Sequence, residues 1–80
     1  MVTPESIEHN IGQGMSTTHL NVDGDGRHFE AVVVSGEFAG MSRVQRHQRV
    51  YQTLGERMRE EVHALSIKTF TPQEWESRHK

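Results

Sequence analysis

The sequence contains no cysteine. This absence excludes disulfide bonds, a thiol nucleophile and a thiolate metal site supplied by this chain alone. No run of residues approaches the roughly 20 apolar side chains that a membrane-spanning helix needs, and the N-terminal residues do not form a signal peptide. We therefore expect a soluble, cytoplasmic protein that does not associate with a membrane.

Apolar residues are also scarce, at 32% of the 80 residues. A chain of this length forms one domain with one modest core, so we expect a single domain over residues 1–80. The formal charge of −2 gives no overall attraction to nucleic acid. Any binding of nucleic acid must then come from a local patch.

The sequence also lacks a recognisable catalytic set. It has no phosphate-binding loop and no serine placed by local spacing beside a histidine and a carboxylate. Glu60 and Glu61 are adjacent on a predicted helix, so their side chains point in different directions and cannot share a proton. We expect that the protein is not an enzyme.

Histidine is abundant, with six residues that are the only soft-metal ligands available. His63 lies between a predicted helix and a predicted strand, where it is either exposed as a ligand or partly buried against a backbone carbonyl. His28 lies at the mouth of a predicted hairpin, where a merely exposed polar residue is an equal alternative. His47 is expected to be structural, buried and hydrogen-bonded in the core. The others are expected at the surface: His9, His19 and His79.

The longest periodic stretch runs from residue 42 to residue 70. Ser42 and Gln45 form a capping box that marks the start of a helix of about five turns. The side chains expected on its apolar face are Val44, His47, Val50, Tyr51, Leu54 and Met58. From residue 64 onward the apolar side chains alternate with polar ones, which predicts a strand.

Shorter elements flank this stretch. A helix is predicted from Thr3-Pro4 to about Gly14, and it should pack weakly because its apolar stripe is sparse. Strands are predicted over residues 18–22 and 28–34, joined by a turn at residues 23–26.

Two aromatic side chains are expected to anchor the remaining segments. Phe38 should tuck a short connection at residues 35–40 against the core. Thr71-Pro72 starts a final helix that ends at about residue 78, and Trp75 should pin that helix to the sheet. The predicted order is therefore α-β-β-α-β-α, an α+β domain with helices on one face of a small sheet.

Four segments of the chain resemble the BolA-like family. They are His28-Phe29 leading into residues 32–35, Phe38-x-Gly40, Arg46-His47-x-x-Val50-Tyr51, and His63-Ala64-Leu65-Ser66 running on to Thr71-Pro72-x-Glu74-Trp75. The resemblance covers about residues 20–75. The turn at residues 24–29 and the segment at residues 40–44 are most similar to short bacterial, acid-resistance-type members.

This resemblance implies a three-stranded mixed sheet related to the type II KH domain. It also implies a monothiol glutaredoxin as partner, with a [2Fe–2S] cluster held by the glutaredoxin cysteine and glutathione on one side and by this chain on the other. His63 takes the role of the family's histidine ligand, and His28 matches its second ligand. Two protein ligands are too few for a closed structural site, so the isolated protein is expected to carry no cofactor.

Some BolA-like proteins are described as DNA-binding transcriptional regulators of stress response and cell morphology, which is the alternative function. Arg43, Arg46, Arg49 and Arg57 could form a basic stripe that contacts phosphates, and the first three are the candidate nucleic-acid-binding residues. The alternative for these arginines is a solvated helix face interlaced with acidic side chains. Those acidic side chains are Glu56, Glu60 and Glu61.

The loop at residues 36–40 departs from the KH pattern. A nucleic-acid-binding KH domain carries a GxxG loop, whereas here Gly36 and Gly40 are three residues apart and the loop contains the acidic Glu37. Binding of a single strand in the KH manner is therefore in doubt. The protein alone is expected to be a monomer or a weak homodimer that pairs through a strand edge.

Overall fold

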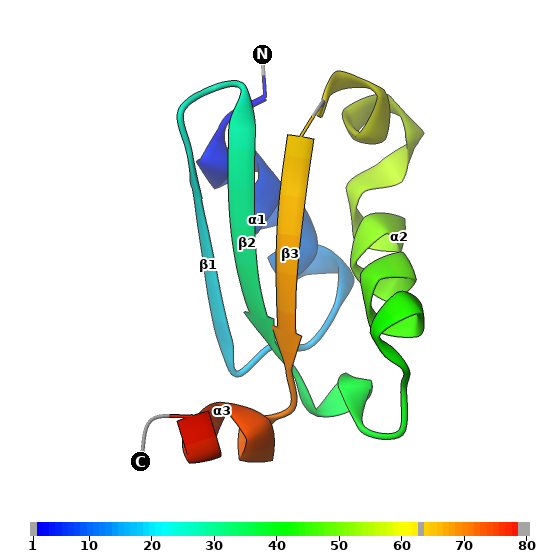
Figure 1. Cartoon of the computed structure of the whole chain (residues 1–80). Coiled ribbons are helices and arrows are strands. Elements are labelled where there is room, and N and C mark those ends of the chain that lie inside the picture. The colour runs from blue at the N-terminus through cyan, green and yellow to red at the C-terminus, as the bar shows by residue number, and fades with distance from the viewer. Residues whose placement is uncertain (1, 63, 79–80) are drawn as a thin grey trace.

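A computed structural model describes residues 2–62 and 64–78, with the side chain of residue 57 left out. Figure 1 shows the order of its elements, which confirms the predicted α+β arrangement. The elements are α1 (Pro4–Gly14), β1 (His19–Gly24), β2 (His28–Val34), the 3-10 helix η1 (Gly36–Phe38), α2 (Arg43–Glu61), β3 (Ala64–Phe70) and α3 (Pro72–Arg78). Within the described ranges, no helix is long and apolar enough to cross a bilayer.

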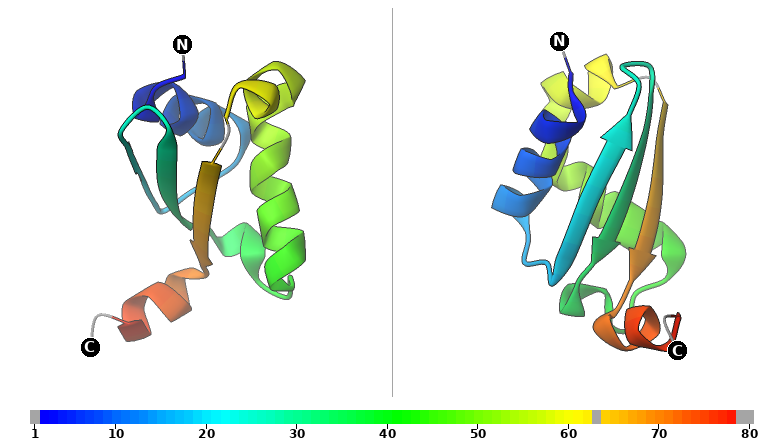
Figure 2. Two further views of the ribbon diagram at one scale, coloured as in Figure 1. Left: turned by 45° about the horizontal axis from the view of Figure 1, so that its top comes forward. Right: turned by 90° about the vertical axis from the view of Figure 1, so that its left-hand side faces the viewer.

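The sheet is mixed and has the strand order β1-β2-β3. β1 pairs antiparallel with β2, and β2 pairs parallel with β3. Helices α1 and α2 lie side by side against one face, whereas the short α3 lies where β3 ends (Figure 2). The relation to the type II KH fold stays a prediction.

Helix α1 packs closely, so the prediction of weak packing was wrong. Ile7 and Ile11 are fully buried, and Met15 is 6% exposed. The stripe is sparse, but all of it enters the core between α2 and the sheet. Thr3 caps the helix as predicted, in a capping box with Ser6 that the sequence analysis did not identify. The helix ends at Gly14, where it was expected to end.

Helix α2 is two helical segments rather than one. Its capping box between Ser42 and Gln45 is present as predicted. At Gly55 the backbone leaves helical geometry, with φ at 77° and ψ at 162°, and the ribbon in Figure 1 changes direction. This left-handed φ favours glycine, and it turns the second segment back toward the start of β3.

Two residues of the predicted apolar face of α2 lie elsewhere. Val50 and Leu54 are buried as expected, but Val44, in the first turn of α2, is 64% exposed. His47 is half-buried beside an open pocket rather than enclosed in the core. The helical period fixes which side chains share a face, not how far along the helix the core extends.

The two predicted aromatic anchors are in place. Phe38 is fully buried. Trp75 stacks on His19 with ring centroids 4.8 Å apart and contacts Phe70 at 5.3 Å. His19 and Phe70 flank the fully buried Val34 in the strand register. Trp75 therefore holds α3 against the side chains of His19 and Phe70 at one end of the sheet.

Candidate functional site

The hairpin between β1 and β2 fixes the backbone of the predicted ligand His28. The Asp25 carboxylate accepts hydrogen bonds from the backbone N–H of Arg27 at 2.9 Å and of His28 at 2.8 Å. The Asp25 N–H in turn donates to the His28 carbonyl at 3.2 Å. These bonds, that of His28 first, hold the pKa of Asp25 below its usual value. Gly26, with φ at 99°, supplies the left-handed turn residue.

The imidazole of His28 is presented to solvent. Its side chain is 77% exposed, and its Nδ1 atom lies 3.9 Å from an Asp25 carboxylate oxygen. A shallow hollow of about 420 Å³ lies beside it, lined also by the acidic side chains of Asp23 and Glu30. The His28 imidazole is therefore accessible from solvent.

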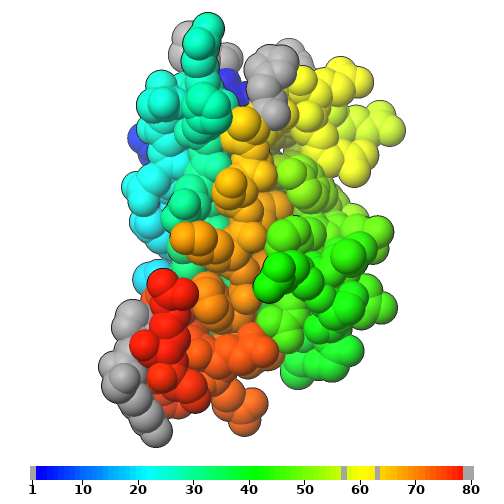
Figure 3. Space-filling model, in the orientation of Figure 1, coloured from blue at the N-terminus to red at the C-terminus, as the bar shows by residue number. Residues whose placement is uncertain are grey.

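The second predicted ligand, His63, lies outside the described residues, as does His79. The parallel register pairs His28 with Ala64, the first residue of β3 and the chain neighbour of His63. Figure 3 shows the hairpin and the start of β3 at the same end of the molecule. The fold therefore places His28 and the first residue of β3, which follows His63 in the sequence, at the same end of the sheet.

The described residues form no complete metal site by themselves. No group of three or more His, Cys, Asp or Glu side chains among residues 2–62 and 64–78 is arranged to hold a metal ion. A structural metal site normally has four protein ligands.

Two arginines of the predicted basic stripe hold elements of the fold together. The Arg46 guanidinium forms two bonds with the Glu74 carboxylate, at 2.8 and 3.3 Å, and so ties α2 to α3. Arg49 donates to Glu37 at 3.1 Å and to the Gly14 carbonyl at 3.0 Å. Their partners are thus Glu74 and Glu37 rather than the glutamates at the end of α2.

These contacts also change the electrostatics of both carboxylates. The pKa of Glu37 is lowered, first by the hydrogen bond from the Ser16 N–H and then by the charge of Arg49. The pKa of Glu74 is lowered, first by its bond with Arg46 and then by the Thr71 N–H. The acidic charge in the loop at residues 36–40 is therefore offset by Arg49, which the sequence alone did not indicate.

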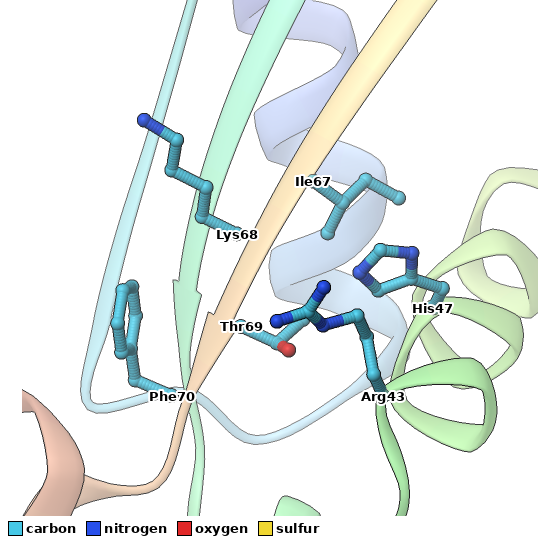
Figure 4. Close-up of a pocket in the computed structure, with 6 residues that line it drawn as sticks. All are labelled: Arg43, His47, Ile67, Lys68, Thr69 and Phe70. Carbon is cyan, nitrogen blue, oxygen red and sulfur yellow. The ribbon is translucent and has the colours of Figure 1, made fainter.

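Arg43 differs from the other two arginines. It is exposed, and it forms no ion pair within the part of the chain that the structure describes. Together with His47 it lines a pocket of about 310 Å³ whose other wall is residues 67–70 of β3 (Figure 4). The sequence did not predict this pocket, because it forms only where the first turns of α2 lie beside the edge of the sheet.

Comparisons with known proteins identify the family. The family model described as BolA-like protein matches residues 1–74. The chain is 41% identical to the acid stress protein IbaG of Escherichia coli over 70 residues, which cover 86% of this chain and 83% of that protein. It is 42% identical over 65 residues to the DNA-binding transcriptional regulator BolA of Haemophilus influenzae. That match covers 81% of this chain but only 63% of the relative.

A solved structure supports the same assignment. A BolA protein homologue from Coxiella burnetii superposes with a TM-score of 0.82 at 45% identity, covering 95% of this chain and 99% of that one. Family model, sequence relatives and fold therefore agree, and the chain belongs to the BolA-like protein family.

Proposed function

We propose that this protein binds a monothiol glutaredoxin and that the two proteins share a [2Fe–2S] cluster, to which this chain contributes His28 and His63. One observation carries the proposal: the parallel register pairs exposed His28 with Ala64, the chain neighbour of His63. In such a shared cluster the remaining ligands would come from the glutaredoxin cysteine and glutathione.

The residues of this chain have distinct parts in that function. Asp25 fixes the His28 backbone through the hairpin bonds, and the exposed imidazole offers a nitrogen donor. The cluster, when bound, supplies a redox-active iron–sulfur centre, and imidazole ligation raises its potential relative to all-cysteine ligation. The protein would then act as an accessory or regulatory protein of iron–sulfur metabolism.

A titration of the full chain into a cluster-loaded monothiol glutaredoxin, with glutathione present, tests the proposal. Visible absorption and circular dichroism should report a new spectrum for the wild type. His63→Ala and His28→Ala should lose or alter it, while His9→Ala, on the exposed side of α1, should not. An unchanged spectrum in both ligand variants would contradict the ligand assignment.

A second candidate is binding of DNA as a transcriptional regulator. Its support is the similarity to relatives such as the DNA-binding transcriptional regulator BolA of Haemophilus influenzae, together with the exposed Arg43 at the start of α2, for which the described residues provide no ion-pair partner. Affinity for duplex DNA should fall with salt, and Arg43→Gln should reduce the salt slope by about 1. Arg59→Gln, also exposed on α2, is the matched control. Binding that is absent at low salt would remove this candidate.

A further inference from the structure

Strand β3 forms a long, regular edge of the sheet. It is the last strand in the order β1-β2-β3, and all seven of its residues pair in continuous register with β2. It contains neither a proline nor a break in register that would mark a bulge, and its one charged side chain, Lys68, pairs with Glu30. Monomeric proteins usually protect such an edge with a proline, a bulge, charged side chains or a covering segment, and Lys68 is the one such device within β3.

The free edge of β3 lies open beside the first turns of α2. The pocket lined by Arg43, His47 and residues 67–70 follows this edge (Figure 4). A second hollow, of about 370 Å³, continues past Thr69 and Phe70 to Glu74 at the start of α3. The two hollows share Arg43, so together they make one groove, the β3 groove, along residues 67–74.

The side chains around the β3 groove alternate in direction. In Figure 4, Ile67 and Thr69 point toward α2, where Arg43 and His47 meet them, whereas Lys68 and Phe70 point to the opposite face. Lys68 pairs there with Glu30 at 3.5 Å. Because Arg46 is already bound to Glu74, Arg43 supplies the one arginine charge of the groove that no described residue offsets.

We infer that the β3 groove binds an extended, acidic segment of a partner protein, which pairs with the free edge of β3 as a fourth strand. Backbone N–H and C=O groups of β3 would supply the pairing, as in other complexes formed by strand addition. One carboxylate of the segment would pair with Arg43, near Thr69. Two residues away, on the same face of the added strand, an apolar side chain would lie near Ile67.

Charge favours this occupant over two others. A nucleic acid strand presents a phosphate at every nucleotide. Arg43 is the one arginine of the groove without an ion-pair partner among the described residues, so the groove would neutralise few of these phosphates. A second copy joined through β3 would bring two Arg43 side chains of like charge toward one interface. The other edge strand, β1, carries Asp23, which would repel an acidic segment. The inference does not depend on the cluster or on a glutaredoxin.

The test uses the full chain, labelled with ¹⁵N, and a capped eight-residue peptide of alternating threonine and valine with one central glutamate. Amide signals of residues 64–70 and of Arg43 should shift, while those of β1 should not. The glutamate peptide should bind up to about fivefold more tightly than its lysine counterpart at low salt, the range of an exposed ion pair. A peptide N-methylated at alternate residues should not bind, because it cannot pair with the strand.

Matched variants complete the test. Arg43→Gln should abolish the preference for glutamate over lysine, and Arg59→Gln should keep it. Equal affinity of the two peptides for the wild type, or shifts confined to β1, would overturn the inference. The inference would also be overturned if, without any peptide, the amide signals of residues 64–70 shifted as the protein concentration rises. Such shifts would show that a second copy of the chain pairs with this edge. Tighter binding of single-stranded oligothymidine at the same amides would assign the groove to nucleic acid instead.

Discussion

Replacing Gly55 with alanine tests the break in α2. The backbone at Gly55 has φ at 77° and ψ at 162°, a combination that residues with a Cβ atom rarely adopt. A Cβ atom placed on Gly55 meets no atom within 4 Å. The substitution therefore isolates the cost of the backbone conformation, without a steric clash against a neighbouring side chain.

The expected loss in the free energy of unfolding is about 1–3 kcal/mol, the cost of such a conformation for a non-glycine residue. A competing effect has the opposite sign. In a helix interior alanine is more favourable than glycine by about 1 kcal/mol. The variant would gain this free energy if α2 became one straight helix. A straight helix, however, would move Met58 and Val62 away from the core against which they pack. We expect the loss to dominate.

Thermal unfolding followed by far-ultraviolet circular dichroism measures the effect. A domain of this size loses about 4–8 °C of melting temperature per kcal/mol, so Gly55→Ala should melt several degrees below the wild type. Gly36→Ala is the matched control, because a Cβ atom there also meets nothing within 4 Å but the backbone has no left-handed φ. It should stay within about 0.5 kcal/mol of the wild type. A Gly55→Ala variant as stable as the control would refute this account of the kink.

Three further predictions concern stability. The folded pKa of Glu37 lies below its ordinary value of 4.5, so its stabilising contribution is complete above that value and is lost as the pH falls through the folded pKa. Glu37→Gln should therefore lose less stability than the wild type between about pH 7 and pH 3 in urea titrations. Trp75→Ala should cost about 2 kcal/mol in urea unfolding, roughly half the value for a fully buried tryptophan, and Gln73→Ala, exposed on the same helix, should cost almost nothing. Asp25→Ala should destabilise the hairpin, because the backbone N–H groups of Arg27 and His28 lose their acceptor, and it should speed hydrogen exchange of the amide of residue 28; unchanged exchange would contradict the hairpin geometry.

Local signals predicted the elements well because they act within a few residues. The capping box of α2 is present where the sequence placed it. Helix α3 begins after Thr71 and strand β2 covers residues 28–34, both as predicted. The burial of Phe38 and the contact of Trp75 with the sheet were also predicted correctly. Gly55 was a missed local signal, since a glycine inside a helical pattern is a known point of interruption.

The features that were missed depend on contacts between distant segments. The sequence placed Arg46 and Arg49 on a solvated face, but their partners Glu74 and Glu37 come from α3 and η1. Helical period alone gave no sign of these pairs. The β3 groove was missed for the same reason, because it exists only where α2 lies beside the edge strand.

The parallel pairing of β2 with β3 has a consequence for folding. The β1–β2 hairpin contains only local contacts and can form early, whereas Ala64 reaches His28 only after the chain has passed through η1 and α2. Contacts between residues so distant in sequence form late, because closing the intervening loop costs entropy. A partly folded chain would then carry the hairpin without the neighbouring strand. If the cluster is shared as we propose, it could be loaded only after β3 has paired with β2, and partly folded chains would not receive it.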